Sequence, residues 1–559
     1  MACRFRLAFL FTAFAAVSCS STSDSQSAGV ATAPVRDAPP ASGAEPAHVA
    51  SLVGAKESAR DEAVPRGESA ERLHFVVLHT NDVHGQVLPR KATWLKRADP
   101  PMVGGLARVA ARIQREKRAA EKAGAHVLVL DGGDCYQGTP EGVIDGGLPF
   151  LRAMTAVGYD AVCVGNHEFD FGVPHLVALL RDSKLPTVLA NVLERSTSTR
   201  VAWTPPWRIV ERGGIRIALV GLVSPETPEI THPDAQALVF VDPAVALVGA
   251  RAELAGHADW ILPVTHLGID DDRAVARAHP DLPLVVGGHS HTFLKEGVRE
   301  GTTLIVQTGA KASAIGRVDL WLDPVTKKVV ESRAQLIDLD EEPAAEDRVA
   351  LVEQICADLA AKSAARMGEV VGELSGPLTR SKDPLGSSSA GNFMADALRK
   401  FAVADVGVMN RGGIRTDLDA GPITRRNAFE LCPFENNVTV LTLTGAELLA
   451  MIEKSVVGTA HSGLEVSGLV IEAAIDAQGV RSLRGLQVGG VPVDPKKEYR
   501  VAMNSFLADG GDAYVPKYAP GTKRKDDPTL MRDLIEETFR NAQVVAPNGE
   551  NRYVVSRSP

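Results

Sequence analysis

The chain has 559 residues, of which 45% are hydrophobic and 23% are charged, and its formal net charge is −9. This length exceeds what one ordinary core fills, so we expect a globular protein with two large domains. The sequence contains no long basic run, which argues against a nucleic acid polymer as a partner while leaving a small anionic substrate open.

The N-terminus has the pattern of an export signal. Arg4 and Arg6 precede the apolar stretch Leu7–Val17, which is too short to span a bilayer and is typical of a signal peptide. Small residues then precede Cys19, as in the cleavage box of bacterial lipoproteins. We therefore predict a lipidated Cys19 as the attachment to a membrane, and a periplasmic or outer-membrane-anchored location. The box usually has leucine where Ala16 stands, and ordinary cleavage that releases a free exported protein is the alternative.

The rest of the chain alternates between strand and helix patterns. Residues 20–71 are rich in Ser, Ala, Pro and Gly and cannot bury a core, as expected for a flexible tether. Beyond them, apolar strands alternate with helical stretches such as Leu106–Lys122, which Gly124 would terminate. A helix is predicted over 342–367, and no internal repeat or membrane-spanning helix is expected. The predicted organisation is a signal peptide over 1–19, a tether over 20–71, an α/β domain over 73–340, a linking helix over 341–368 and a second α/β domain over 369–559.

Four cysteines lie outside the leader, at positions 135, 163, 356 and 432. They show no C-x-x-C spacing, which argues against a zinc ribbon. We expect free, buried thiols. A disulfide between Cys135 and Cys163 is the alternative, because an exported protein folds in an oxidising compartment.

Five short polar motifs follow apolar runs in the first domain. Short runs of Val, Ile and Leu bounded by Gly, Pro or Asp predict buried strands. The motifs are Thr80-Asn-Asp82-Val-His84-Gly, Asp131-Gly-Gly-Asp134, Gly165-Asn166-His167-Glu168-Phe-Asp170, Thr265-His266-Leu-Gly and Gly287-Gly-His289-Ser-His291. Ligands of open α/β sheets bind outside the carboxyl ends of the strands. Five strands would therefore bring Asp, His and Asn side chains to one edge, where they could form a metal site.

The residue types of these motifs limit the choice of metal. Asp82 and His84 lie two residues apart, as do His289 and His291, so each pair can present both side chains on one face of a strand. Mixed imidazole, carboxylate and amide ligands suit zinc, manganese, iron or cobalt rather than calcium. Seven such side chains exceed what one tetrahedral ion needs and suit two ions that share a carboxylate. A single histidine such as His266, taken alone, would more often be a capping or solvated residue.

In this order the five motifs resemble the calcineurin-like metallophosphoesterases, and more closely the 5′-nucleotidase family, over residues 73 to about 525. The resemblance implies an α/β protein with an N-terminal four-layer αββα sandwich and a separate C-terminal α/β substrate-binding domain. It implies two divalent metal ions, zinc, manganese or similar. One would be held by Asp82, His84, Asp134 and His291, the other by Asp134, Asn166, His266 and His289, with Asp134 bridging. Relatives often have Gln or Asn at the position of His291.

The resemblance also implies roles for two residues that do not bind metal. His167 would stabilise the phosphoryl group and the leaving oxygen, and Asp170 would orient His167. The alternative for Asp170 is a helix N-cap before Phe171-Gly172.

The second domain carries residues suited to a nucleotide. Arg415 ends the segment Asn410-Arg-Gly-Gly-Ile-Arg415, and a guanidinium can bind phosphate as a fork. The resemblance implies that Arg415 binds the terminal phosphate, Asn410 contacts the nucleoside, Phe434 and Phe506 sandwich the base, Asp512 binds ribose hydroxyls, and Arg380 matches a second family arginine. Core packing is the alternative for both phenylalanines. Pro384 stands where relatives commonly carry another arginine, for which Lys382 could compensate.

The predicted function is that of an exported dinuclear-metal phosphohydrolase that releases phosphate from nucleotides. Alternatives with the same metals are a 2′,3′-cyclic-nucleotide phosphodiesterase, a UDP-sugar pyrophosphatase acting on a nucleotide-sugar substrate, and a thiosulfate-handling hydrolase. A non-catalytic nucleotide-binding surface lipoprotein is the alternative of another class. The complete ligand set and the presence of both His167 and Asp170 argue against it.

Overall fold

The structure, a computed structural model, describes residues 72–92, 99–459, 461–515 and 523–557. The predicted signal peptide, Cys19 and the tether lie outside the described residues. Among the described residues, no helix has the length and apolar character that a membrane span requires. The four cysteines among the described residues are free and buried, as predicted.

A first six-stranded sheet begins with the apolar segment that precedes Asp82. Its strands, in spatial order, are β16 (Val329–Asp338), β15 (Ala314–Leu322), β1 (Leu73–Thr80), β4 (His126–Asp131), β5 (Ala161–Cys163) and β6 (Thr187–Val188). Strands β1, β4, β5 and β6 run parallel to one another, whereas β15 and β16 are antiparallel to their neighbours. The parallel strands are almost entirely buried because layers cover both faces of the sheet.

A second six-stranded sheet carries the remaining two motifs. Its strands, in spatial order, are β13 (Val298–Glu300), β14 (Thr303–Val306), β12 (Leu284–Val286), β11 (Trp260–His266), β9 (Ile215–Val223) and β8 (Trp207–Arg212). The four central strands are parallel, and the two edge strands are antiparallel to them.

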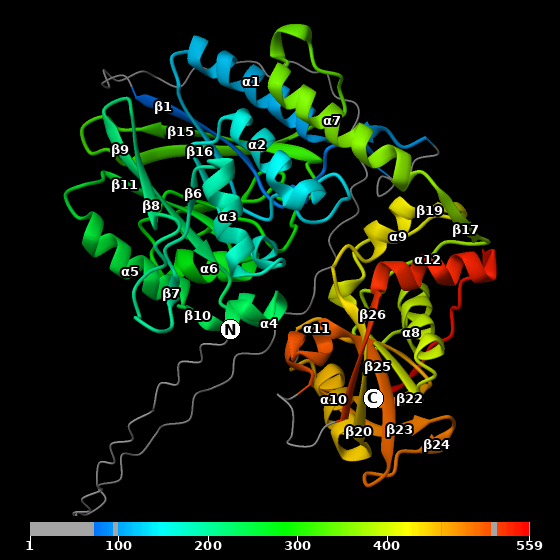
Figure 1. The fold of residues 1–559 in the computed structure, drawn as a ribbon. Helices are drawn as coiled ribbons and strands as arrows, with labels where there is room; N and C mark the ends of the chain where they lie inside the picture. The colour runs from blue at the N-terminus through cyan, green and yellow to red at the C-terminus, as the bar shows by residue number, and fades with distance from the viewer. Residues whose placement is uncertain (1–71, 93–98, 460, 516–522, 558–559) are drawn as a thin grey trace, which may run out of the picture. The chain divides into compact units, whose positions relative to one another are not determined.

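These two sheets and their helices form four layers. Side chains such as Phe75 and Leu128 of the first sheet and Leu219 and Val264 of the second share one core. Helices α1 (Leu106–Lys122), α2 (Leu148–Val157) and α3 (Val173–Ser183) pack on the outer face of the first sheet, α7 (Ala350–Met367) packs against α1 and α2, and α5 (Pro243–Leu254) and α6 (Ile269–Ala278) pack on the second sheet (Figure 1). The four-layer αββα sandwich is confirmed.

Two helices have bounds that can be compared with those predicted from the sequence. Helix α1 has the predicted bounds, and Gly124 follows it with a left-handed φ of 81°. The helix predicted over 342–367 begins only at Ala350. The segment before it forms the 3₁₀ turn Ala345–Asp347, and Arg348 and Val349 that follow have extended backbones, so the α-helix starts only after them.

Shorter elements connect the layers. They are β2 (Arg90–Lys91), β3 (Met102–Val103), β7 (Val192–Glu194), β10 (Leu238–Phe240) and α4 (Thr227–Ile230), with 3₁₀ turns η2 (Ile144–Gly147), η3 (His167–Phe169) and η4 (Pro233–Ala237).

The C-terminal part contains three further sheets. A five-stranded sheet has the order β21 (Leu464–Ser467), β18 (Val406–Asn410), β25 (Glu498–Asn504), β20 (Asn437–Thr444) and β26 (Lys523–Leu530). A four-stranded sheet has the order β24 (Val491–Pro492), β23 (Arg481–Val488), β22 (Leu469–Ile475) and β28 (Tyr553–Arg557). A three-stranded sheet has the order β19 (Gly421–Thr424), β17 (Val370–Leu374) and β27 (Val544–Val545).

The five-stranded sheet has a core on each face. Helices α8 (Ser389–Phe401), α9 (Arg425–Leu431) and α12 (Met531–Ala542) cover one face, together with β17 and β19. Helix α10 (Gly445–Val457) and the four-stranded sheet cover the other. The short helix α11 (Ser505–Ala508) begins where β25 ends. This part is the separate C-terminal α/β domain that the sequence predicts.

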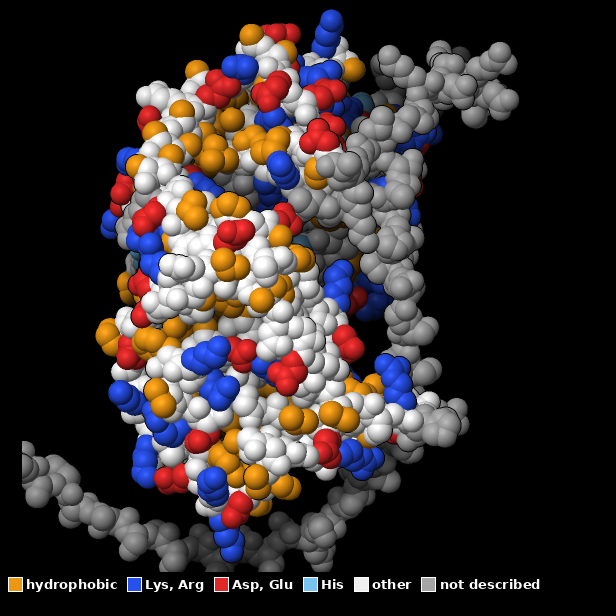
Figure 2. Space-filling view, turned by 90° about the vertical axis from the view of Figure 1, so that its right-hand side faces the viewer, with side chains coloured by type: hydrophobic (Ala, Val, Ile, Leu, Met, Phe, Trp, Pro, Cys, Tyr) orange, Lys and Arg blue, Asp and Glu red, His pale blue; other side chains and the backbone are white. Residues whose placement is uncertain are grey.

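Charges of both signs are mixed on the molecular surface. On the face seen in Figure 2, lysine and arginine side chains are interspersed with aspartate and glutamate side chains over the described residues.

Candidate metal centre and active site

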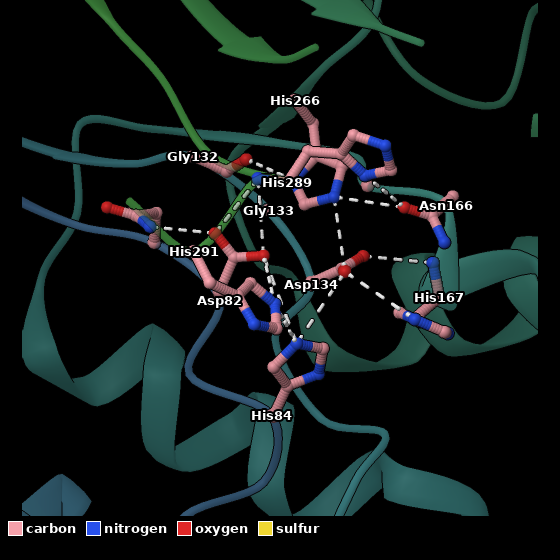
Figure 3. Close-up of polar contacts among 12 residues, drawn as sticks. Asp82, His84, Gly132, Gly133, Asp134, Asn166, His167, His266, His289 and His291 are labelled. Carbon is pink, nitrogen blue, oxygen red and sulfur yellow. Dashed lines mark hydrogen bonds and ion pairs between the residues drawn. The ribbon is translucent and has the colours of Figure 1, made fainter. Parts of the chain in front are cut away.

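The parallel strands carry all five motifs at or just beyond their carboxyl ends. The loop after β1 carries Asp82 and His84, the loop after β4 carries Asp134, the loop after β5 carries Asn166 and His167, β11 ends in His266, and the loop after β12 carries His289 and His291. Figure 3 shows that these side chains point toward one another. The structure therefore brings together the seven predicted ligands and the predicted catalytic histidine.

Five of the predicted ligands have a left-handed backbone. The φ angles are 51° at Asp82, 51° at His84, 57° at Asp134, 76° at His289 and 53° at His291. This conformation costs a non-glycine residue about 1–2 kcal/mol, so the surroundings must enforce it. The loops after β1 and β4 hold each other: the Asp82 N–H donates to Gly133 O at 2.8 Å, and the His84 N–H to Asp134 O at 2.9 Å. Backbone strain is thus concentrated at the candidate site.

Asp82, His84 and His291 form a first group of possible metal ligands. One donor atom from each lies within 4.8 Å of the others. His84 Nδ1 lies 2.9 Å from the carbonyl oxygen of Gln137 and donates to it, so its Nε2 carries a lone pair. That Nε2 lies only 3.0 Å from His291 Nε2, which in turn lies 3.2 Å from Asp82 Oδ1.

A second group lies beside the first. Asp82, Asp134 and His266 also have donor atoms within 4.8 Å of one another. His266 Nδ1 donates to the carbonyl oxygen of Gly132 at 2.8 Å, which directs Nε2 toward Asp134 Oδ2 and Asn166 Oδ1, both at 3.1 Å. The same Asn166 oxygen lies 2.9 Å from Nδ1 of His289.

The donor set fits divalent metal ions. Carboxylate oxygens, an amide oxygen and imidazole lone pairs converge on a buried space, and groups that only accept hydrogen bonds repel one another unless a cation lies between them. Burial would raise the pKa of Asp82, but the neighbouring His291 and His266 outweigh burial and lower it to about 2. Burial likewise opposes a charge on His266, but Asp134 and Asp82 raise its pKa to about 10. The same His266 nitrogen can bind a proton or a metal ion, so the two compete.

Both carboxylates face both groups. Asp82 belongs to each group by distance, whereas the family resemblance makes Asp134 the bridge. Asp134 Oδ2 lies 3.1 Å from His266 Nε2 and 3.8 Å from His84 Nε2, so it too is placed between the groups. The assignment of each ligand to one ion stays a prediction.

His167 and Asp170 form a hydrogen-bonded pair at the edge of the metal centre. His167 opens the 3₁₀ turn η3, and its Nδ1 lies 2.7 Å from Asp170 Oδ2. Thr231 donates to the other oxygen of Asp170 at 3.0 Å. Burial lowers the pKa of His167, but the carboxylates of Asp170 and Asp134 outweigh it and raise the pKa above the ordinary value. The orienting role predicted for Asp170 has the geometry it requires, and no helix N-cap bond is formed at this position.

Glu168 is a functional residue that the sequence interpretation did not assign. Its side chain is buried, and its carboxylate accepts from the N–H groups of Gly165 at 2.7 Å, Asp134 at 3.0 Å and Cys135 at 2.7 Å. Burial raises its pKa to about 7. Glu168 therefore ties the loop after β4 to the loop after β5. Its position inside the Gly-Asn-His-Glu motif was the sequence feature from which a role for Glu168 could have been predicted.

A second such residue is Asp272, which no motif indicated. It is completely buried in α6 and accepts from Thr265 Oγ1 at 2.6 Å and from Gln307 Nε2 at 3.1 Å. Gln307 Oε1 in turn accepts from Ser290 Oγ at 3.0 Å. The network connects the end of β11, which carries His266, to the loop that carries His289 and His291.

A cavity of about 660 Å³ opens beside the metal centre. It is lined by residues of both parts of the chain. From the first part they include Asp134, Asn166, His167, Asp170, His289 and His291, and from the second Asn410, Arg415, Phe434, Phe506 and Asp512. Five of the six predicted substrate residues thus line one cavity with the predicted catalytic pair.

Arg415 and Phe434 lie next to His167. The Nη2 atom of Arg415 is 3.4 Å from Nε2 of His167, and the Phe434 ring stacks on the imidazole with centroids 5.7 Å apart. The guanidinium of Arg415 also lies over the Phe434 ring, 5.7 Å from its centroid. Burial lowers the pKa of Arg415, and the attraction of Asp134 and Asp170 for its positive charge opposes that effect. The guanidinium therefore interacts electrostatically with Asp134 of the metal centre.

Arg380, the sixth predicted substrate residue, is not among the residues that line the cavity. Its side chain is about half exposed, and both its backbone N–H and its Nε donate to Asp417 Oδ1, at 2.9 and 3.0 Å. The nearby Pro384 lies in a turn whose carbonyl groups, at Asp383 and Gly386, accept from Arg411 at 2.6 and 2.5 Å. Among the predicted arginines, only Arg415 reaches the cavity.

Comparisons with known families agree with this architecture. The profile of the calcineurin-like phosphoesterases matches residues 75–293, and that of the 5′-nucleotidase C-terminal domain matches residues 370–518. The chain is 29% identical over 497 residues to protein UshA of Escherichia coli, which covers 80% of this chain and 87% of the relative. It is 28% identical over 534 residues to a 5′-nucleotidase of Vibrio parahaemolyticus, which covers 86% of this chain and 92% of the relative.

Solved structures show the same fold. A 5′-nucleotidase precursor from Thermus thermophilus superposes with a TM-score of 0.76 at 28% identity, over 87% of this chain and all of that one. The sulfate thiohydrolase SoxB of the same organism shares the fold alone, with a TM-score of 0.72 at 20% identity over 89% of this chain and 98% of that one. The metallophosphoesterase fold implies divalent metal ions, and the ligand groups described above are in place for them. Both domain profiles, the relatives and the fold together place this chain in the 5′-nucleotidase family of calcineurin-like metallophosphoesterases, which are hydrolases of phosphate esters.

Proposed function

We propose that this protein hydrolyses nucleotides with two divalent metal ions and releases inorganic phosphate. The observation that carries the proposal is the position of Arg415, whose Nη2 lies 3.4 Å from Nε2 of His167 in a cavity that Phe434, Phe506 and Asp512 also line. A phosphate-binding cation, a catalytic base or acid, and side chains suited to a nucleoside therefore share one cavity.

The metal ions would be held by the two groups of ligands around Asp82 and Asp134. When bound, a pair of divalent ions activates a water nucleophile and neutralises charge on the phosphoryl oxygens. His167 faces the same space with Nε2, because Asp170 holds its Nδ1. Its raised pKa keeps a proton available for the oxygen that leaves phosphorus. Arg415 binds a phosphate oxygen and excludes water from the reacting end of the cavity.

The other end of the proposed substrate is the nucleoside. Phe434 and Phe506 offer aromatic faces to a base, and every base can stack on such a face. The carboxylate of Asp512 can accept hydrogen bonds from ribose hydroxyls. The relatives named 5′-nucleotidase support this substrate class.

A substrate panel on the purified full-length protein tests the proposal. After treatment with a chelator, the protein is assayed with and without added Mn²⁺ or Zn²⁺ on AMP, UDP-glucose, 2′,3′-cyclic AMP, bis-p-nitrophenyl phosphate and p-nitrophenyl phosphate. We expect metal-dependent phosphate release from AMP. Faster turnover of the cyclic nucleotide or the diester would favour the phosphodiesterase alternative. Absence of hydrolysis of every substrate, followed through the product that each one yields and with bound metal verified, would refute the enzyme proposal.

We further propose that the protein is exported and anchored by a lipid on Cys19. The basic residues Arg4 and Arg6, the short apolar stretch after them and the small residues before Cys19 support this proposal. Cell fractionation and labelling with a fatty acid analogue test it, with Cys19→Ala as the comparison. Lipid labelling that persists in the variant would refute the assignment of Cys19, and retention of the wild-type chain in the cytoplasm would refute export.

A further inference from the structure

Asn504 is a buried amide whose orientation the structure determines. It is the last residue of β25 and caps α11, and its side chain is completely buried. Its Oδ1 accepts from the backbone N–H of Leu507 at 2.9 Å. Because a backbone N–H can only donate, this atom must be the oxygen, and Nδ2 must point the other way.

The amide hydrogens of Asn504 begin a directed chain of hydrogen bonds. Nδ2 of Asn504 donates to Asn410 Oδ1 at 2.9 Å, and Nδ2 of Asn410 donates to Asp512 Oδ2 at 2.9 Å. Ser462 Oγ donates to the same oxygen of Asp512 at 2.5 Å. Asp512 lines the cavity, and Ser462 and Asn410 hold its carboxylate through Oδ2, which leaves Oδ1 without a donor among the described residues.

The helix that Asn504 caps also carries Phe506. The ring of Phe506 lies against Gly511: a methyl group added there would be 2.5 Å from Cζ. Gly511 directly precedes Asp512, whose backbone is left-handed with a φ of 55°. The ring and the carboxylate therefore occupy one compact turn, and Asn504 connects to both of them. The connection to the ring runs through the cap, and that to the carboxylate runs through Asn410.

We propose that Asn504 is a positioning residue for the nucleoside-binding end of the cavity, a role that rests on the proposed nucleotide function. It would act on substrate recognition through Phe506 and Asp512 without touching the substrate. The polarity of its amide is the physical basis. Only a side chain that accepts from α11 and donates to Asn410 can leave the second amide donating to Asp512.

The replacement Asn504→Asp tests this polarity at constant size. The carboxylate keeps an oxygen to cap α11 but turns a second oxygen toward Asn410 Oδ1. If Asn410 keeps its orientation, its Oδ1 faces the new carboxylate oxygen and has lost its donor. If the Asn410 amide rotates, it donates to the new aspartate, and its oxygen then faces Asp512, which loses a donor. In both cases a buried or charged oxygen is left without a hydrogen bond.

The matched control is Asn427→Asp, the same change at the third residue of α9. There the side-chain oxygen accepts from the backbone N–H of Thr424 in a capping box, and an aspartate keeps that bond. Both variants and the wild type are assayed with AMP and with p-nitrophenyl phosphate, which carries no nucleoside. Thermal unfolding and metal content are measured alongside.

We expect Asn504→Asp to raise the KM for AMP about tenfold to hundredfold, with turnover of p-nitrophenyl phosphate within about twofold of wild type. Asn427→Asp should change neither. An unchanged KM for AMP in Asn504→Asp would overturn the inference, as would an equal loss on both substrates, which indicates a general folding defect. If the wild type itself does not prefer AMP over p-nitrophenyl phosphate, the proposed function fails before the variant is considered.

Discussion

Nδ1 of His167 and Oδ2 of Asp170 lie 2.7 Å apart, and this contact determines which nitrogen of the histidine faces the cavity. Thr231 holds the second oxygen of Asp170 at 3.0 Å, so the carboxylate cannot turn away. The imidazole ring is therefore fixed in one orientation beside Asp134. The backbone N–H of His167 donates to Asp134 Oδ1 at 2.9 Å. A residue held in this way can act on the substrate without serving as a metal ligand.

His167→Ala should therefore separate catalysis from metal binding. We expect kcat to fall by about 10²–10⁴-fold, the range typical for loss of a general acid or base. The metal content should stay at the wild-type value, because the alanine keeps the backbone N–H that Asp134 accepts. Steady-state kinetics and elemental analysis check both statements. Loss of metal from the variant would instead make His167 a ligand.

Arg415→Lys should weaken the binding of phosphate esters. Lysine keeps the charge but loses the planar fork that holds two phosphate oxygens, so we expect kcat/KM for AMP to fall roughly 10- to 100-fold. Arg181→Lys is the control, because that arginine is exposed and bonds only to the adjacent Asp182 among the described residues. Equal activity of the two variants would contradict the role given to Arg415.

Gly287→Ala should damage the loop that carries His289. A methyl group at this position would lie 2.1 Å from Asp272 Oδ2, and Asp272 is fully buried. We expect a loss of about 1–3 kcal/mol in the free energy of unfolding, together with weaker metal binding. Denaturant unfolding and metal titration measure the two effects.

Gly249→Ala is the matched control for that substitution. Gly249 lies inside α5, where the nearest atom to an added methyl group is 3.7 Å away. Alanine should there stabilise the protein by about 0.5–1 kcal/mol, because it restricts the unfolded chain and favours the helix. A similar loss of stability in both variants would show that the contact with Asp272 is not the cause.

His461 should make stability depend on pH. Hydrogen bonding to Glu226 raises its pKa to about 9, although partial burial opposes the charge, and Glu229 is 2.7 Å from the other nitrogen. Asp512 also interacts electrostatically with His461. Because the folded pKa exceeds the unfolded value, the contribution is complete below about pH 6.5 and is lost as the pH rises through about 9. Both glutamates are half exposed, so the contribution should stay below about 1 kcal/mol.

The measurement for this prediction is urea unfolding at about pH 6 and about pH 10. His461→Gln should reduce the difference in unfolding free energy between the two pH values. His257→Gln, at an exposed histidine, should leave the difference unchanged. A wild-type difference that survives in His461→Gln would assign it to other groups.

The alternation of strands and helices and the gathering of the predicted ligands could be predicted from the sequence because they depend on local patterns, whereas the four-layer arrangement was predicted only through the family resemblance. Each motif directly follows an apolar run, and parallel strands end at a common edge. The start of α7 differs from the prediction because helix-forming composition extends over residues 342–349, whereas Arg348 and Val349 have extended backbones directly before the helix. Asp272 and Gln307 could not be predicted because their contacts join residues 35 positions apart, with no motif around either of them.

The sequence by itself determined the chemical types of the ligands, their order along the chain and their placement at strand ends, since these depend on residues close together in the chain. The tertiary structure decided which charged groups reach the cavity. Arg380 and Arg415 both match family arginines by sequence, yet Arg380 is paired with Asp417, 37 residues away, while Arg415 lies against His167, 248 residues away. The reason is physical: the groups within reach of a guanidinium depend on how distant segments of the chain pack, and the local sequence does not determine this.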